Sequence, residues 1–397
     1  MSDNNKKRIG IDARFYGPLG KGLGRYVQEV VDNAIALDAA GNQEFEFVIF
    51  LSPENYDSYC CPNASVKKIM VSQRWYSWRE QLFLPMILKK ENLDLVHFPH
   101  FNVPIFTPVP FVVTIHDLIL TRFPSRRASM LPPILYWVKQ AAYRLVVRTA
   151  VKRAQMIITV SKFTKDDIVK KFKALPEKIH ITYEGVVDFH GEDRNNKNYL
   201  EAAAVLSKYA ITSPYLLYVG NAYPHKNLER LLAVYKELQK VRPDLSLIMV
   251  GKDDFFYTRV KNKAVELGLK KPEGNKGGVV FPGYVPDAHL ETLYKQALLY
   301  VFPSLYEGFG LPPLEAMSHS CPVVASNQAS LPEILDEAAA YFDPYNEKEM
   351  VATILALIAD ENRRQELAAK GRERIRHFSW QKCAQETLDI YREALDK

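Results

Sequence analysis

The chain has 397 residues, of which 47% are hydrophobic and 25% are charged. One hydrophobic core rarely grows to this length, so the sequence predicts two α/β domains, and the composition excludes long disordered tracts. The net charge is +6, and residues 121–178 alone hold 14 Lys and Arg against 3 Asp and Glu. No recognisable nucleic-acid-binding motif accompanies this charge, so we expect no nucleic-acid partner.

The N-terminal residues lack the apolar stretch of a signal peptide. The uncharged run Leu95–His116 holds four prolines, which favours two buried strands joined by loops over a membrane-spanning helix. The four cysteines show neither zinc-ligand spacing nor a disulfide pattern. We therefore expect a cytoplasmic chain without a transmembrane segment.

Short apolar runs alternate with longer amphipathic stretches, as in α/β proteins with parallel sheets. In the first half, strands are predicted at 8–14, 46–51, 93–98, 111–117, 156–161 and 179–186, and helices at about 24–38, 80–90, 133–153 and 164–174. The stretch 188–214 begins with a polar run that has no periodic apolar face, which predicts a surface connection between domains.

The alternation then restarts. Strands are predicted at 215–220, 245–251, 279–285, 300–304, 321–326 and 339–342, helices near Asn227, Thr258, Asp287 and Pro313, and a last helical pair at about 361–376 and 380–396. The expected architecture is two Rossmann-like, doubly wound domains, at 1–195 and 208–376. Open parallel sheets bind ligands beyond the carboxyl ends of their strands, so we expect the domains to face each other across a shared cleft.

The segment 304–317, SLYEGFGLPPLEAM, is the strongest candidate for a binding site. A strand leads into a turn with two glycines, and two prolines then open a helix. Amides near Gly310 and Leu311 would lie at the positive end of the helix dipole, where an anion such as a diphosphate binds. The glycines, Gly308 and Gly310, would let that diphosphate approach the backbone.

Two carboxylates flank this turn, Glu307 on the loop and Glu315, which we expect in the first helical turn. Carboxylates accept hydrogen bonds from vicinal hydroxyls, so a sugar and a ribose on either side of a diphosphate would satisfy both. Alternatively, Glu315 complements the helix dipole and Glu307 is a solvated loop residue. The residues alone leave both interpretations open.

At this point the chain resembles the family 4 retaining glycosyltransferases, which have the GT-B fold. The segment 304–317 looks like their E-x7-E motif. Further segments resemble the family in the expected order: GLGRYVQEV (22–30), VTIHDL (113–118), ITVSKFTKDDI (158–168), YVGNAYPHKNLERLL (218–232), GYVPDAHLETLYKQA (283–297) and CPVVASNQASLPEIL (321–335). Residues 378–397 look like the family's closing helix, which returns to the N-terminal domain.

The resemblance implies an acceptor-binding N-terminal domain and a nucleotide-sugar-binding C-terminal domain. It implies that Glu307 holds the donor sugar and Lys226 the diphosphate, and that His116 lies beside the reacting sugar; these three are the candidate catalytic residues. The implied nucleotide-sugar site comprises Gly22, Gly24, Asn221, Lys226, Tyr284, Val285, Glu307, Gly308, Phe309, Gly310, Leu311 and Glu315.

One position departs from the family pattern, since Asn221 stands where many members have a phosphate-binding arginine. The diphosphate would then be bound by Lys226 and backbone amides alone, or a basic residue of the N-terminal half would take the place of the missing arginine. Lys226 could also be a solvated lysine before a helix. His116 could be a core histidine, as we expect of His97 and His100.

No Asp-x-Asp and no zinc-ligand spacing occurs, and the resemblance implies transfer without a metal or other cofactor. Glycines 20, 22 and 24 suggest a dinucleotide fingerprint, but its third glycine is missing, which argues against a nicotinamide enzyme. The expected reaction passes through an oxocarbenium-like transition state, in which positive groups stabilise the leaving diphosphate.

The acceptor is a glycan or a lipid-linked molecule on this interpretation, as in cell-surface polysaccharide or glycolipid synthesis. Residues 122–153 combine eight Lys and Arg with several aromatic and aliphatic residues, which suits an anionic membrane surface or a lipid-diphosphate acceptor. The alternative is a helix that packs its apolar stripe in the N-terminal domain and leaves its cations in solvent.

Three other functions stay open at this stage: a sugar-nucleotide epimerase, a phosphorylase and a non-catalytic nucleotide-sugar-binding protein. An epimerase would release nucleotide without an acceptor, and a phosphorylase would need free phosphate. The turn GNAYPHKN looks similar to that of mannosyltransferases that use GDP-mannose, so the expected donor is GDP-mannose first and a UDP-sugar second.

Overall fold

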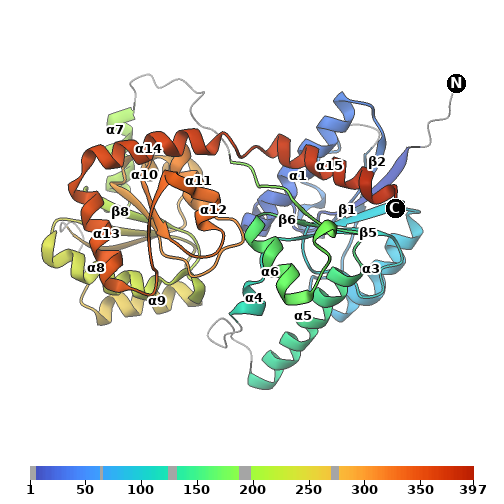
Figure 1. The fold of residues 1–397 in the computed structure, drawn as a ribbon, viewed down its shortest axis with the longest axis horizontal. Helices are drawn as coiled ribbons and strands as arrows, with labels where there is room; N and C mark the ends of the chain where they lie inside the picture. Colours follow the sequence, from blue (N-terminus) through green and yellow to red (C-terminus); the bar gives the residue numbers. More distant parts are fainter. Residues whose placement is uncertain (1–5, 63–65, 124–131, 187–197, 270–276) are drawn as a thin grey trace. The chain divides into compact units, whose positions relative to one another are not determined.

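The structure is a computed structural model that describes residues 6–62, 66–123, 132–186, 198–269 and 277–397. The chain folds into two compact units (Figure 1): unit 1 is Met1–Gly185 with Ser379–Lys397, and unit 2 is Val186–Phe378. The last helix therefore belongs to the unit that contains the N-terminus.

Unit 1 contains one parallel sheet with the strand order β3-β2-β1-β4-β5-β6-β7. Its central strands are buried apolar runs, as expected of a parallel sheet covered on both faces. The strands are β1 Lys7–Asp12, β2 Phe45–Leu51, β3 Val66–Met70, β4 Leu95–Phe98, β5 Phe111–Ile115, β6 Met156–Thr159 and β7 Ile179–Ile181.

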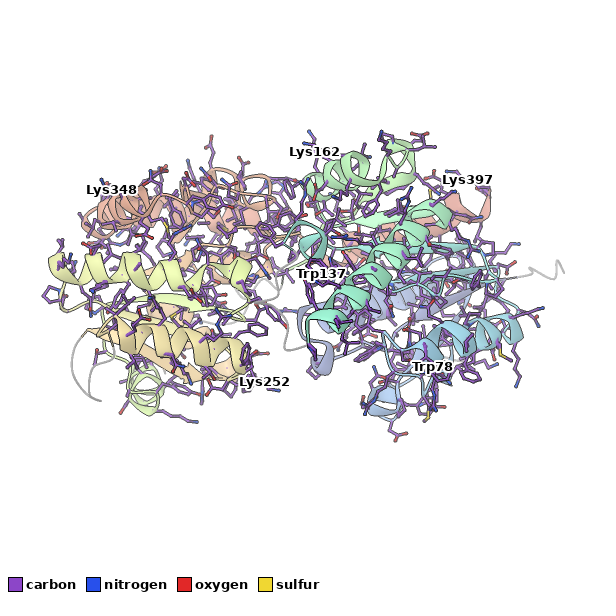
Figure 2. The ribbon with its side chains drawn as sticks, turned by 90° about the horizontal axis from the view of Figure 1, so that it is seen from below. Trp78, Trp137, Lys162, Lys252, Lys348 and Lys397 are labelled. Carbon is purple, nitrogen blue, oxygen red and sulfur yellow. The ribbon has the colours of Figure 1, made fainter. Side chains whose placement is uncertain are left out.

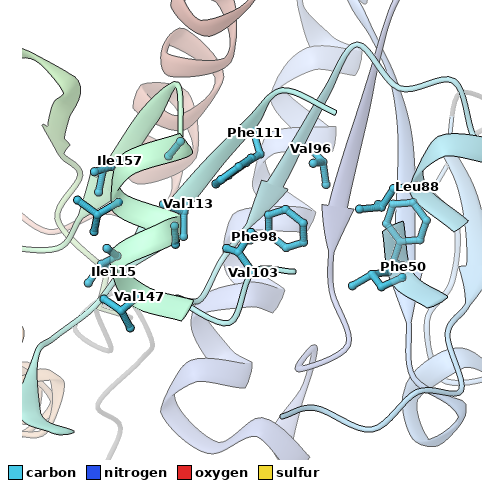
Figure 3. Close-up of a cluster of buried hydrophobic side chains, with 14 of the residues drawn as sticks. Phe50, Leu88, Val96, Phe98, Val103, Phe111, Val113, Ile115, Val147 and Ile157 are labelled. Atoms are coloured by element: carbon cyan, nitrogen blue, oxygen red, sulfur yellow. The ribbon is translucent and has the colours of Figure 1, made fainter. Parts of the chain in front are cut away.

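The helices of unit 1 are α1 Lys21–Ala40, α2 Pro53–Tyr56, α3 Trp78–Lys90, α4 Ile119–Arg122, α5 Pro133–Arg153, α6 Lys162–Phe172 and α15 Trp380–Leu395. Leu88 of α3, Val147 of α5 and Ile168 of α6 belong to one hydrophobic cluster with strands β4 and β5, part of which is drawn in Figure 3. These three helices thus cover the same face of the sheet, whereas α15 packs against α1.

Unit 2 contains a second parallel sheet with the order β10-β9-β8-β11-β12-β13. Its strands are β8 Tyr215–Val219, β9 Ser246–Val250, β10 Gly278–Gly283, β11 Leu299–Phe302, β12 Val323–Ser326 and β13 Ala339–Phe342. Its helices are α7 Asn198–Lys208, α8 Leu228–Val241, α9 Phe255–Glu266, α10 Asp287–Gln296, α11 Leu311–Ser318, α12 Leu331–Leu335, α13 Glu347–Ala359 and α14 Glu361–Ile375.

Two parallel, doubly wound sheets confirm the predicted fold class. The prediction of an irregular connection over 188–214 is wrong in part, because α7 occupies Asn198–Lys208; residues 187–197 lie outside the described residues. Strand β3 and helix α13 were not predicted. The run 95–116 forms β4 and β5, and no described helix is long and apolar enough to cross a bilayer.

Candidate functional site

The glycine turn after β11 needs glycine at one position. Gly310 has φ +112° and is the N-cap residue of α11, a backbone conformation that side chains disfavour. A Cβ atom at this position would also lie 2.9 Å from Cδ2 of Leu331. No side chain caps α11, and prolines occupy its second and third positions. The amides of Gly310 and Leu311 thus mark the positive end of this helix.

A buried serine, Ser330, positions the same turn through hydrogen bonds to its backbone carbonyl groups. Ser330 Oγ hydrogen-bonds the backbone carbonyl oxygens of Glu307, at 3.1 Å, and of Phe309, at 2.9 Å. The Phe309 ring meets the Phe378 ring edge-on, with centroids 5.5 Å apart. Ser330 lies in a segment that resembles the family, but its role could not be predicted from the sequence because its partners are backbone atoms.

Lys226 and Glu307 lie 81 positions apart in the sequence and meet in unit 2. The Lys226 ammonium donates to Oε1 of Glu307 at 2.6 Å, and both side chains are about nine-tenths buried. The same nitrogen lies 5.3 Å from the centroid of the Phe302 ring. A buried charge needs a partner, so neither residue is the solvated side chain that the alternative interpretation proposed.

Local structure explains how Lys226 reaches the turn. Pro224–Lys226 form a 3₁₀ turn, and Asn227, with φ +61°, redirects the chain into α8. The backbone amide of Leu305 donates to the carbonyl oxygen of His225 at 2.8 Å. This bond joins the loop after β8 to the loop after β11, and both follow the carboxyl ends of adjacent parallel strands.

His225 is a neighbour of this ion pair that sequence reasoning missed. Burial, and then the charge of Lys226, lower its pKa to about 4. Its imidazole is therefore neutral at pH 7, and Lys226 is the cation of this turn.

The other predicted donor residues of unit 2 have different surroundings. Asn221 Oδ1 accepts from the backbone amide of Tyr223 at 3.3 Å, within its own loop. Tyr284 is 72% exposed, whereas Val285 is buried. Glu315 is the fifth residue of α11, beyond the first turn in which we expected it. The structure thus places Glu307, Gly308, Phe309, Gly310 and Leu311 in one turn and brings Lys226 to it.

In unit 1, His116 is held by two acceptors. Its Nδ1 lies 3.1 Å from Oε1 of Glu184, and its Nε2 lies 3.0 Å from the carbonyl oxygen of Pro99. A carbonyl oxygen only accepts, so both bonds form when the imidazole is protonated and Glu184 is ionised. Burial opposes that charge, but Glu184 raises the pKa of His116 above its usual value.

The two predicted glycines of unit 1 lie in the first turn of α1. A Cβ atom on Gly24 would fall 2.0 Å from the carbonyl oxygen of Gly17, so this close approach requires glycine. A Cβ atom on Gly22 would meet no atom within 4 Å. Packing therefore explains Gly24 and leaves Gly22 without a structural reason.

His97 is a core histidine, bonded through Nδ1 to the Tyr391 hydroxyl at 2.7 Å and through Nε2 to Thr114 Oγ1 at 2.8 Å. Burial lowers its pKa to about 3. Burial also lowers the pKa of His100 to about 3. Both histidines are thus neutral at pH 7.

Within the described ranges, no group of three or more His, Cys, Asp and Glu residues is placed to hold a metal ion. All four cysteines are free thiols, two exposed and two buried.

Comparison with known sequences finds two matching families. The profile of "Glycosyltransferase Family 4" matches residues 22–188, and that of "Glycosyl transferases group 1" matches residues 207–374. The chain is 32% identical to O-antigen chain mannosyltransferase B of Escherichia coli over 75% of its own length and 74% of that protein. It is 29% identical to O-antigen chain mannosyltransferase RfbU of Salmonella typhimurium, over 70% and 69%.

Solved structures show the same fold. A sucrose-phosphate synthase from Thermosynechococcus elongatus superimposes with a TM-score of 0.73 at 20% identity, covering 98% of this chain and 99% of that one. WaaG, a glycosyltransferase involved in lipopolysaccharide biosynthesis, superimposes with a TM-score of 0.71 at 16% identity, covering 96% and 99%. At these identities the likeness establishes the GT-B fold alone.

Proposed function

We propose that this chain, which belongs to the family 4 glycosyltransferases, a family of retaining hexosyltransferases, transfers mannose from GDP-mannose to a glycan or lipid-linked acceptor. The observation that carries the proposal is the buried pair of Lys226 and Glu307 at the glycine turn before α11. A cation, a carboxylate and helix N-terminal amides are the groups that a sugar diphosphate needs.

In this proposal the diphosphate binds at Lys226 and the amides of Gly310 and Leu311. The phosphate oxygens would take hydrogen bonds of the Lys226 ammonium, and the Glu307 carboxylate would accept hydrogen bonds from hydroxyls of the donor sugar. Glu315 would hold the ribose hydroxyls, and Val285 and Tyr284 the base. Gly308 and Phe309 would shape the turn, and Asn221 would face the diphosphate without supplying a positive charge.

The chemistry follows from where negative charge develops. The bond between the anomeric carbon and the phosphate oxygen breaks, its electron pair stays with the nucleoside diphosphate, and the Lys226 ammonium and the helix amides stabilise that charge. The acceptor hydroxyl then bonds to the same face of the anomeric carbon, which retains its configuration. The hydroxyl proton passes to the departing diphosphate.

We assign His116 of unit 1 to the reacting sugar, and Gly22 and Gly24, in the first turn of α1, to the close approach of the backbone to the donor. Since both ring nitrogens of His116 donate to acceptors of the protein, its role is that of a fixed positive charge, held by Glu184. It is not a free general base in this arrangement.

The preference for mannose rests on two relatives whose names describe O-antigen chain mannosyltransferases. Those names also support an acceptor in cell-surface polysaccharide synthesis. A UDP-sugar is the second candidate donor, because a structural neighbour from Anabaena was solved in complex with UDP and glucose, at 16% identity and a TM-score of 0.70.

A thermal-shift screen of GDP, UDP, dTDP and ADP, each with its sugars, tests the donor. A ligand at 100 times its Kd stabilises the folded chain by about 2.7 kcal/mol, which is enough to rank the nucleotides. GDP and GDP-mannose should give the largest shifts. A larger shift with UDP would replace the donor but keep the reaction, whereas no shift with any nucleotide would contradict the site.

Product analysis then separates transfer from the alternatives. A transferase releases the nucleoside diphosphate at a rate that depends on an acceptor. An epimerase would release it without an acceptor, a phosphorylase would need free phosphate, and a binding protein would give a thermal shift without turnover.

A further inference from the structure

Helix α3 exposes an apolar stripe. Trp78, Leu82 and Met86 recur every four residues, so they lie on one side of the helix, and each is 58–67% exposed. The opposite side carries Leu84 and Leu88, which pack in the core. The stripe is therefore additional to the face that holds the helix on the sheet.

Helix α5 repeats this arrangement. The inner side of α5 faces the core, and its residues 136, 140, 147, 150 and 151 are buried. Its outer side carries Ile134, Val138 and Leu145, which are 56–82% exposed. The alternative given above, an apolar stripe packed in the N-terminal domain, thus describes only one of the two apolar sides of α5.

The two stripes belong to one surface of unit 1. Helices α3 and α5 cover the same face of the sheet, and the loop between β4 and β5 connects them. The Ile105 amide donates to the Gln81 side chain of α3 at 2.9 Å, and the Arg153 guanidinium of α5 donates to the Thr107 carbonyl at 2.8 Å. Between these anchors Phe106 is 79% exposed. We call the two stripes and Phe106 the apolar face; Figure 2 labels Trp78 and Trp137 on its two helices.

The charge around the apolar face is of one sign. Helix α5 contains five Lys and Arg and no Asp or Glu, and α3 contains three Lys and Arg. The single acidic residue of α3, Glu80, is buried and paired with Arg14. An exposed apolar patch with cations and without exposed carboxylates suits binding to an anionic bilayer, because its apolar side chains can enter the acyl region while the cations contact the headgroups.

A basic pocket adjoins the apolar face where α5 meets α6. It has a volume of about 510 Å³ and is lined by Thr121, Arg144, Arg148, Lys171, Phe172 and Lys173. Among the described residues, none of these four cations forms a salt bridge with a carboxylate. These four cations, which have no carboxylate partner in the described part of the chain, surround one hollow that suits a phosphate group.

We propose that the apolar face inserts shallowly into a bilayer and that the basic pocket receives the phosphate headgroup of an anionic lipid. The same pocket borders α5, so the contact would hold unit 1 at the membrane independently of donor binding in unit 2. This inference does not depend on the identity of the transferred sugar. A second copy of the chain is the competing occupant, but it would bring the same cations to the interface and repel itself.

Vesicle flotation of the full chain tests the proposal. Wild-type protein should float with vesicles made of equal parts phosphatidylglycerol and phosphatidylcholine, and much less with phosphatidylcholine alone. The double variant R148Q/K171Q should bind the anionic vesicles about 30-fold more weakly, since each cation near such a surface contributes about 1 kcal/mol, or about fivefold.

The matched control removes the same charge from unit 2. Lys252 and Lys348, labelled in Figure 2, are exposed, and K252Q/K348Q should leave vesicle binding within about twofold of wild type. If both double variants lost vesicle binding equally, the proposed role of the basic pocket would be overturned, because the binding would then be non-specific electrostatic attraction.

The apolar face is tested on α3, outside the basic segment. L82S/M86S should weaken binding roughly tenfold for each side chain removed from the bilayer. Because both side chains are exposed, the melting temperature and the nucleotide-induced thermal shift should not change, so lost binding is not a folding or donor-site defect.

Fluorescence reports insertion directly. Brominated lipids should quench wild-type tryptophan emission. W78F should reduce the quenched fraction, and so should W137F, because Trp137 is also exposed on α5 beside the stripe, whereas buried Trp380 stays unquenched. Absence of quenching, or a dimer without vesicles that L82S/M86S dissociates, would overturn the membrane assignment.

Discussion

Each unit buries a cation against carboxylates, but the two clusters differ in how completely their hydrogen bonds are satisfied. In unit 1, Arg14 donates to both oxygens of Asp12 at 2.7 Å, to Glu80 at 2.5 Å and to the Gln73 carbonyl at 3.3 Å. Asn102 in turn donates to Glu80 at 2.8 Å. In unit 2, the single hydrogen-bond partner of the Lys226 ammonium among the described residues is Glu307.

This difference separates a structural cluster from a candidate site. Although burial alone disfavours its charge, Asp12 and Glu80 raise the pKa of Arg14, and the planar guanidinium has nearly all its donors occupied. The Lys226 ammonium has three donors, so it retains donors for a phosphate. Burial of an ion pair is therefore not evidence of function, whereas incomplete satisfaction at a glycine turn points to a ligand.

The largest expected effect is on stability, in unit 1. Arg14→Leu leaves the Asp12 and Glu80 carboxylates buried without their partner, and breaking such a cluster costs about 3–5 kcal/mol of unfolding free energy. Chemical denaturation measures the loss, with the exposed Arg74→Leu as a control that should stay near wild type. An Arg14→Leu protein of wild-type stability would show that the cluster is not structural.

The next effect is on catalysis, in unit 2. Lys226→Ala should lower kcat by about 10²–10³-fold, or roughly 3–4 kcal/mol of barrier, because a group that stabilises leaving-group charge is lost. Steady-state kinetics with the best donor of the thermal-shift screen measures it, and the exposed Lys252→Ala is the matched control. Wild-type turnover in Lys226→Ala would rule out the role of this lysine.

Acid should destabilise unit 1 through His97. Its folded pKa of about 3 lies below the usual 6.5, so the unfolded chain takes up a proton that the folded chain refuses. Stability is lost as the pH falls below 6.5, by about 1.4 kcal/mol per pH unit, or about 2 kcal/mol at pH 5. Denaturation curves of His97→Gln should be flatter over this range.

His116 should act with the opposite sign. Because Glu184 raises its folded pKa, its contribution is complete below pH 6.5 and is lost as the pH rises through the folded pKa. Unfolding curves above pH 6.5 that are equally steep in His116→Gln and wild type would contradict this pairing.

The smallest effect concerns the glycine turn. Ser330→Ala removes the hydrogen bonds to the carbonyls of Glu307 and Phe309 and should cost about 1 kcal/mol. Because these bonds position the turn, the Kd of the nucleotide sugar should rise severalfold, as measured by calorimetry. The control is Ser320→Ala, on the loop after α11. A loss of stability with unchanged donor affinity would make Ser330 a packing residue only.

Much of the fold could be predicted because buried parallel strands are continuous apolar runs. Strand β3 escaped prediction since it is an edge strand, VKKIM, with two lysines and only one buried residue. Helix α7 was not predicted because it directly follows a polar stretch, and the predicted irregular connection was extended past that stretch to residue 214. The expected position of Glu315 was wrong because α11 starts at Leu311, which leaves the carboxylate past the first turn.

The sequence by itself determined the two parallel sheets, the glycine turn before α11 and the residue types that a sugar diphosphate needs, because periodicity and local backbone preferences act over a few residues. Only the tertiary structure decided that Lys226 meets Glu307, that Glu184 and Pro99 hold His116, and that α3 and α5 share one exposed apolar face. Those contacts join residues far apart in the chain, and they depend on which strands are neighbours and which side of each helix the core covers.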